Sequence, residues 1–336
     1  MGLNSRQTNV LTSPLVSCLM KAYMSFFPAI AEARNASAEP KSLRLGTASH
    51  PIHVAHVPAM PGERGRLPVV MIHGGFHTGE AYMKTPDGRD GWASLFAARG
   101  HEVYVPDWPC HGHSPGAENI VRLTTLDIAA ALGTLLEAVG PAIVIAHSAG
   151  GPPAWWMAET LPDKVCAVIG VAPGAPANLI NVLPDDPVLV ASLAQDKEAG
   201  CPVYSPRDSP AVAHRAFIRE FWANAPRFPQ AAFDAYAATV VAESPNVLNE
   251  RFNIGGQGLA VREPSVVAQR PLLVITGEHD ARHPRSTDRR LADYLAADFI
   301  WLPDLGIKGN GHMLMIEDNS DEIAQVLFRW LQSKGL

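Results

Sequence analysis

Short apolar runs alternate along most of this chain with segments in which apolar residues recur at helical spacing. The runs indicate buried strands at 69–72, Glu102–Val105, Ala142–Ile145, Val165–Val171, Pro271–Thr276 and Phe299–Leu302. The periodic segments predict helices near Gly91–Arg99, from Thr124 or Thr125 to about Val139, over Gly150–Leu161, near Arg285–Ala296 and over Asp321–Leu331. Strands that alternate with helices are typical of a mostly parallel sheet covered on both faces, so we predict an α/β fold.

The alternation stops between Pro173 and Arg270, where the sequence is rich in proline and alanine. Helical patches remain around Ala211–Ala223 and Pro229–Val241. We expect three parts: residues 1–40, a core of 41–172 and 271–336, and an insertion of 173–270 that forms a lid or cap over the strand ends. The aromatic residues of the insertion either line a substrate pocket or pack it on the core; these are Phe217, Phe221, Trp222, Phe228, Phe233 and Tyr236.

The clearest chemical signal lies where the Ala142–Ile145 run ends. Ser148 follows it, with the small residues Ala146 and Gly150 two positions before and after, and a helix begins at once. This is the form of the nucleophile elbow, G-x-S-x-G, with alanine at the first glycine. Such a turn holds the serine in strained backbone geometry and needs small neighbours. We therefore take Ser148 as the candidate nucleophile.

A serine hydroxyl needs a general base, and the base needs an acid that orients it. Asp280 follows the apolar run that ends at Thr276, and His312 lies in a glycine-rich loop before the last helix. The order Ser, Asp, His fits this type of site. Glu278 is a rival acid, but it stands two residues earlier in the turn and is expected to point away from the site.

The oxyanion of an acyl-transfer reaction needs two N–H donors. We expect one from the amide of Ala149 and the other from Gly75 or Phe76, in the loop after the strand at 69–72. His73 in this loop is expected to form structural hydrogen bonds rather than to act as a base. The candidate substrate pocket consists of His147, Trp108, Phe217, Phe221 and Trp222.

Composition and charge exclude several functions. The chain has 336 residues, of which 47% are hydrophobic and 18% charged, with a net charge of −6. Basic residues form no long run, so neither a nucleic-acid surface nor a polybasic membrane patch is indicated. No stretch approaches the roughly 18–20 apolar residues of a membrane helix. We expect a small-molecule substrate, and a homodimer stays open.

Residues 1–40 allow two interpretations. A mildly apolar stretch, Val10–Met20, and the tripeptide Ala36–Ala38 resemble a signal peptide, but Pro14 and Lys21 interrupt the apolar region. We favour a peripheral N-terminal extension, and hence the cytoplasm slightly over secretion.

Neither the cysteines nor the histidines indicate a metal site. Cys18, Cys110, Cys166 and Cys201 are scattered, so we expect no disulfide framework, and a buried free thiol at Cys166. His50, His53 and His56 alternate as in a strand, which places His53 on the other face. Cys110–His113 offers no further ligand at a spacing that completes a tetrahedral zinc site. We expect neither a metal nor another cofactor.

Three motifs carry a resemblance to a known family. Residues 73–79 read H-G-G-F-H-T-G, residues 85–92 read T-P-D-G-R-D-G-W, and residues 302–313 read L-P-D-L-G-I-K-G-N-G-H-M. With them the chain resembles the α/β-hydrolase superfamily, and within it a bacterial esterase group with an H-G-G-x-x-T-G loop and a T-P-D-G-R-x-G-W segment. The resemblance covers about Val69–Leu331, apart from the insertion, and implies the α/β-hydrolase fold and a serine esterase mechanism.

One departure from that group concerns the acid. Some members carry it as Glu directly after the strand that follows the nucleophile helix, where this chain has Ala172. The acid role therefore falls to Asp280, unless the site works as a dyad.

These observations predict a serine hydrolase that cleaves a carboxylic ester or lactone through an acyl-enzyme. The apolar, aromatic-bearing insertion favours a hydrophobic substrate. Two alternatives remain: a C–C bond hydrolase or lyase that uses the same triad, and a non-catalytic binding protein on the same scaffold. Epoxide hydrolase or dehalogenase chemistry needs Asp at the elbow, and Ser148 excludes it.

Overall fold

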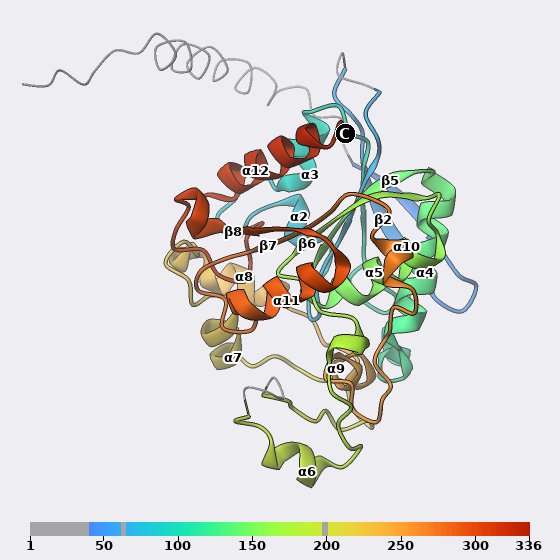
Figure 1. The fold of residues 1–336 in the computed structure, drawn as a ribbon, viewed down its shortest axis with the longest axis vertical. Helices are drawn as coiled ribbons and strands as arrows, with labels where there is room; N and C mark the ends of the chain where they lie inside the picture. The colour runs from blue at the N-terminus through green and yellow to red at the C-terminus, as the bar shows by residue number, and fades with distance from the viewer. Residues whose placement is uncertain (1–39, 62–64, 197–200) are drawn as a thin grey trace, which may run out of the picture. The chain divides into compact units, whose positions relative to one another are not determined.

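A computed structural model describes residues 40–61, 65–196 and 201–336 of the chain. In this part the chain forms an eight-stranded sheet in the order β1-β2-β4-β3-β5-β6-β7-β8 (Figure 1). The strands are β1 (Lys41–Gly46), β2 (Pro51–Val57), β3 (Val69–Ile72), β4 (Val103–Pro106), β5 (Ala142–His147), β6 (Val165–Val171), β7 (Leu272–Thr276) and β8 (Asp298–Trp301). Strands β3 to β8 pair in parallel, while β1 and β2 are antiparallel to their neighbours. The predicted α/β-hydrolase fold class is confirmed.

Successive residues of the inner strands alternate between two apolar clusters. In β3, Val69 and Met71 belong to one cluster and Val70 and Ile72 to the other. The alternation follows from the two-residue period of a strand, and burial on both faces explains why these strands are continuous apolar runs.

Helices cover both faces of the sheet. The first cluster contains buried residues of α3 (Trp92–Ala97) and α12 (Ser320–Ser333). The second contains residues of α4 (Thr125–Val139), α5 (Gly151–Thr160) and α11 (Arg285–Leu295). Figure 1 shows these two sets on opposite sides of the sheet. Smaller elements complete the core: α2 (Glu80–Met83), η1 (Ala117–Arg122), η2 (Ser148–Gly150) and η5 (Leu302–Leu305).

The start of α4 is decided by a capping box. Thr124 accepts the amide of Asp127 on its hydroxyl, and the Asp127 carboxylate accepts the amide of Thr124. These bonds satisfy amides that have no partner within the helix. The sequence allowed the helix to start at Thr124 or Thr125; in the structure Thr124 is the cap and Thr125 is the first helical residue.

The segment between β6 and β7 contains short helices and no strand in its described residues. They are η3 (Ala177–Leu179), α6 (Pro187–Ser192), α7 (Arg215–Phe221), η4 (Gln230–Ala232), α8 (Phe233–Thr239), α9 (Pro245–Arg251) and α10 (Pro264–Val267). Figure 1 shows α6 to α9 gathered at one end of the sheet. The aromatic residues Phe228, Phe233 and Tyr236 are buried in the first apolar cluster, so they pack the insertion on the core.

The structure also differs from the sequence analysis in detail. Strand β1 was not among the predicted strands, and Cys166 is half-buried rather than buried. The two interpretations of residues 1–40 concern residues outside the described part, apart from residue 40. In the described part, no helix is both long enough and apolar enough to cross a membrane.

Candidate active site

Ser148 lies at the turn from β5 to α5, in a conformation that few side chains adopt. Its φ is +48°, in the left-handed region. The turn is crowded: a Cβ at Gly150 would lie 2.7 Å from the carbonyl oxygen of His73, and a Cβ at Gly74 would lie 2.9 Å from Cβ of Ser148. Glycine at these two positions therefore lets the loop after β3 approach the serine closely.

Asp280 and His312 meet although 32 positions separate them in the sequence. Nδ1 of His312 lies 2.6 Å from Oδ2 of Asp280. The other carboxylate oxygen accepts the amides of Arg282 and His283, at 2.9 and 3.2 Å. Because both oxygens are occupied, the carboxylate has a fixed orientation, and it selects the His312 tautomer with the proton on Nδ1. Nε2 of His312 is then the basic nitrogen.

Burial and charge keep this pair in the state that base catalysis needs. Burial acts to raise the pKa of Asp280, but the neighbouring His312 and His283 and the hydrogen bonds outweigh it and lower this pKa to about 2. For His312, burial lowers the pKa more than Asp280 raises it, so the net shift is downward. Near neutral pH, Asp280 is therefore ionised and His312 is neutral.

The His312 loop is held by a buried acid that the sequence analysis missed. Glu317 is fully buried and accepts the side-chain amide of Asn310 at 2.6 Å and the backbone amide of Gly311 at 2.7 Å. Burial raises the pKa of Glu317 to about 7 despite these two hydrogen bonds. The available signal was an acidic residue directly after the apolar run Met313–Ile316.

Ser148 and His312 line one small cavity. Its wall also includes Gly75, Ala149, His147, Trp222 and Arg251, with Phe76, His77, Val247 and Leu248. In the described part of the chain no hydrogen bond joins the Ser148 hydroxyl to His312. Bonds of this kind often tighten only once substrate is bound.

The loop after β3 distinguishes the two candidate oxyanion donors. The amide of Phe76, a residue with φ of +63°, donates to Oε2 of Glu243 at 3.0 Å. Because this amide already donates to Glu243, we do not take Phe76 as an oxyanion donor. The amide of Gly75 has no hydrogen-bond partner among the described residues. Its carbonyl accepts Nδ1–H of His77 at 2.7 Å, which fixes the peptide that precedes Phe76.

Glu243 joins the insertion to the core, and the sequence analysis missed it as well. It is fully buried, and its Oε1 lies 3.3 Å from Nε2 of the buried His111, in the loop after β4. Burial acts to raise the pKa of Glu243, but His111 lowers it below its ordinary value; for His111, Glu243 outweighs burial and raises the pKa. A backbone hydrogen bond also connects the insertion to the core: the amide of Val241 donates to the carbonyl of Phe76 at 2.9 Å.

Two of the five predicted pocket residues line the cavity and three do not. His147 and Trp222 belong to its wall. Trp108 is wrong as a pocket residue, because it is fully buried and its ring stacks on His73 at 4.5 Å. Phe217 and Phe221 do not belong to the wall of this cavity, and the ring of Phe217 contacts both Trp222 and Phe221.

His73 has the structural environment that the sequence predicted. Its Nδ1 donates to the carbonyl of Gly74 at 2.8 Å, and its Nε2 accepts the amide of Trp108 at 3.0 Å. Burial, with His111 nearby, lowers the pKa of His73 to about 3.

Asp107 brings together histidines that the sequence analysis treated separately. Its Oδ2 lies 3.5 Å from Nδ1 of His53 in β2 and 3.2 Å from Nδ1 of His113. Sequence spacing did not reveal this cluster, because His53 and Asp107 come close to His113 only in the fold. The same carboxylate accepts the amides of Gly79 and His113, both at 2.8 Å, which ties the loop after β4 to the loop after β3.

Comparison with known proteins assigns the family. Residues 69–326 match the model of the alpha/beta hydrolase family. The chain belongs to this family. The match spans β3 to α12 and includes the segment between β6 and β7.

Relatives of this alpha/beta hydrolase include proteins described as a lipase and as a hydrolase. A fungal protein described as "Probable secreted lipase phiG" (Fungal sp., strain ATCC 74256) is 24% identical over 343 residues, which cover 83% of this chain and 85% of that protein. A "Pyrethroid hydrolase" from Sphingobium wenxiniae is 31% identical over 126 residues, or 35% of this chain and 41% of that protein. The solved structure of the enol-lactonase from Burkholderia xenovorans LB400 has a TM-score of 0.60 at 17% identity, and the match covers 86% of this hydrolase and 100% of that chain. At this identity the structural likeness shows the fold alone.

Proposed function

We propose that this protein is a serine hydrolase of carboxylic esters or lactones. The observation that carries the proposal is the 2.6 Å contact between Asp280 and His312, at one cavity with a serine in a left-handed turn. A buried carboxylate that orients a neutral imidazole beside a strained serine is the arrangement that activates a hydroxyl nucleophile. The described activities of the lipase and pyrethroid hydrolase relatives support an ester substrate.

In the proposed reaction, Oγ of Ser148 attacks the substrate carbonyl carbon while Nε2 of His312 accepts the hydroxyl proton. The amides of Gly75 and Ala149 donate to the oxyanion of the tetrahedral intermediate. The intermediate collapses as His312 passes its proton to the leaving alkoxide, which departs as the alcohol. Water then attacks the acyl-enzyme with His312 as base and releases the carboxylic acid.

The test compares bond types on wild type and Ser148→Ala. We expect wild type to hydrolyse short 4-nitrophenyl esters or simple lactones, and Ser148→Ala to lose a factor of about 10³ or more in kcat. Turnover of a β-diketone without turnover of any ester would overturn the proposal in favour of C–C bond hydrolysis. If folded wild type turns over neither class and does not react with a fluorophosphonate, the binding-protein alternative is favoured.

A further inference from the structure

A second, larger cavity adjoins the cavity at Ser148. Its volume is about 220 Å³, and Ala149, Val247 and Arg251 line both cavities. Because about 10–15 Å³ of such space holds one water, the cavity has room for a chain of several non-hydrogen atoms. A substrate whose carbonyl reaches Ser148 can therefore extend the rest of one chain into this space.

Two arginines of this cavity have no acceptor for their guanidinium groups among the described residues. Neither Arg251 nor Arg282 forms a side-chain hydrogen bond or an ion pair with any residue in the described part of the chain. The negative charge of Asp280 raises the pKa of both arginines, but its carboxylate oxygens already contact His312 and two backbone amides. Burial and the neighbouring Arg282 lower the pKa of Arg251 to about 9, which is the expected result for a cation that lacks a counter-charge.

Aromatic rings hold these guanidinium groups in place. Cζ of Arg282 lies 5.1 Å from the ring centre of Phe221 and 5.6 Å from that of Phe217, and Cζ of Arg251 lies 5.5 Å from that of Phe252. Contact with a ring leaves the N–H groups at the edge of a guanidinium available, and this edge matches both oxygens of a carboxylate. The two phenylalanines that do not line the catalytic cavity are thus part of the Arg282 environment.

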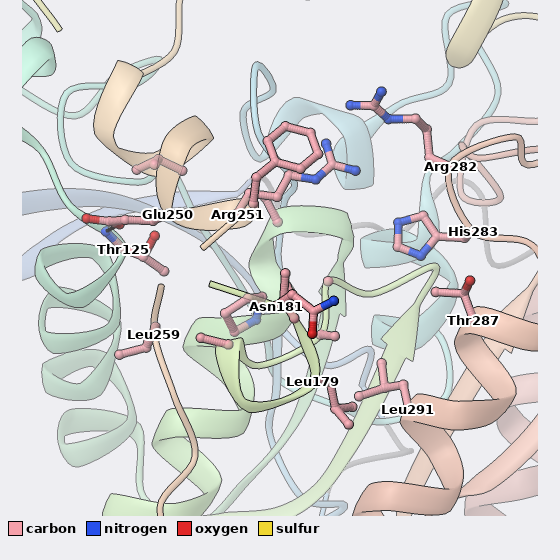
Figure 2. Close-up of a pocket in the computed structure, with 18 of the residues that line it drawn as sticks. Thr125, Leu179, Asn181, Glu250, Arg251, Leu259, Arg282, His283, Thr287 and Leu291 are labelled. Atoms are coloured by element: carbon pink, nitrogen blue, oxygen red, sulfur yellow. Dashed lines mark hydrogen bonds between the residues drawn. The ribbon is translucent and has the colours of Figure 1, made fainter. Parts of the chain in front are cut away.

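His283 adds a buried ring nitrogen to the same side of the cavity. It is 5% exposed and lines the same cavity, yet its Nε2 has no hydrogen-bond partner among the residues that the structure describes. Its Nδ1 contacts Asp288 at 3.0 Å, and Asp288 with Asp280 outweighs the effect of burial and raises the pKa of His283. Figure 2 shows Arg251, Arg282 and His283 along one side of the pocket, with Leu179 and Leu291 on the other.

Glu250 is the one acid among the described lining residues, and it contacts the backbone. Glu250 accepts the amide of Thr125 at 2.7 Å, and burial raises its pKa. Arg290 adds another guanidinium to the lining. The cavity therefore combines a cationic side with an apolar one.

From these contacts we infer that the cavity binds a carboxylate carried by the substrate, so that the protein prefers esters or lactones with a second, ionised acid group. Arg251 and Arg282 bind the carboxylate oxygens, and the leucines contact the alkyl chain. This specificity rests on the proposed function, in which Ser148 attacks the ester carbonyl.

The test compares two esters that differ in one charge, monomethyl adipate and methyl hexanoate. We expect wild type to favour the anionic ester at least tenfold in kcat/KM. Arg251→Met should reduce that preference at least tenfold, and Arg251→Lys, which keeps the charge, should restore part of it. Arg289→Met is the matched control, since Arg289 is exposed on α11, pairs with Asp293 and does not line the cavity.

Calorimetric binding to Ser148→Ala separates this inference from the proposed function. We expect monomethyl adipate to bind at least tenfold more tightly than dimethyl adipate, and Arg251→Met in that background to abolish the difference. If no ester is hydrolysed but this binding pattern holds, the proposed function fails and the carboxylate site stands. If esters are hydrolysed but neither rate nor binding depends on the charge, the carboxylate site is wrong.

Thermal unfolding separates recognition from a structural role. Arg251→Met removes an unpaired, partly buried cation, so we expect its Tm to equal or exceed that of wild type. A clear fall in Tm, together with equal losses for the two esters, would show that Arg251 serves the fold rather than the substrate.

Discussion

Replacing Glu243 by glutamine tests the idea that this buried acid fixes the loop that carries Gly75. The substitution keeps the shape and one acceptor oxygen but removes the charge that faces His111 at 3.3 Å. Breaking a buried ion pair from one side costs about 3–5 kcal/mol. His111 can shed its proton, which lowers the cost, so we expect about 3 kcal/mol. At about 2 °C for each kcal/mol, this is a fall of roughly 6 °C in Tm.

The pKa shifts of His111 and Glu243 predict at which pH the loss of stability in Glu243→Gln is largest. The pKa of His111 is raised above its ordinary value of 6.5, so its stabilising contribution is complete below pH 6.5 and is lost as the pH rises through the raised value. The pKa of Glu243 is lowered below 4.5, so its contribution is complete above pH 4.5 and is lost as the pH falls through the lowered value. The effect of Glu243→Gln is therefore largest between pH 4.5 and 6.5.

A double-mutant cycle with His111→Gln, followed by urea unfolding, isolates the pair. We expect the double variant to be more stable than the sum of the single losses predicts, by at least about 1.5 kcal/mol. We also expect kcat to fall in Glu243→Gln, because Phe76 and the preceding Gly75 are less well fixed. Additive losses, or a loss that is the same at pH 6 and pH 9, would refute the proposed coupling.

Three further predictions concern the site. The acid limb of kcat/KM should have an apparent pKa below 6.5, because burial lowers the pKa of His312 more than Asp280 raises it; a limb at pH 7 or above would contradict this assignment. Gly150→Ala should lower kcat at least tenfold and cost about 1–3 kcal/mol in urea unfolding, since its Cβ would lie 2.7 Å from the His73 carbonyl; unchanged kinetics would show that the turn has room. Because the pKa of Glu317 is raised to about 7, the folded state of wild type should lose up to about 3 kcal/mol as the pH rises from 4.5 to 7; Glu317→Gln should lack this slope, and equal slopes would rule out the shift.

The sequence was sufficient to predict most of the sheet and the fold class. Strands β3, β5 and β6 are buried on both faces, so their apolar runs carry the signal without help from distant residues. Strand β1 is exposed or half-exposed along its length and lacks such a run, which is why the sequence analysis did not include it. The bounds of helices differed by a few residues, because caps such as that of Thr124 depend on local hydrogen bonds.

Part of the candidate site could also be predicted from the sequence, because some of its residues stand in local sequence patterns. Ser148, Asp280 and His312 each follow a recognisable local pattern at a strand end or in a glycine-rich loop. Glu243 and Arg251 do not, since their roles arise from contacts with His111 and with a cavity, and those contacts depend on how the insertion folds back on the core. Trp108 was misplaced because a position after a strand end does not by itself show which way a ring points.

Covalent labelling with a fluorophosphonate, followed by peptide mapping, would show whether Ser148 is an activated nucleophile. We expect a single label on Ser148 of wild type, no label in Ser148→Ala, and labelling slowed by a factor of about 10³ or more in Asp280→Asn, because that side chain orients His312 and stabilises its protonated form. A folded wild-type protein that takes no label, or a label on Ser148 that forms equally fast without Asp280, would contradict the triad.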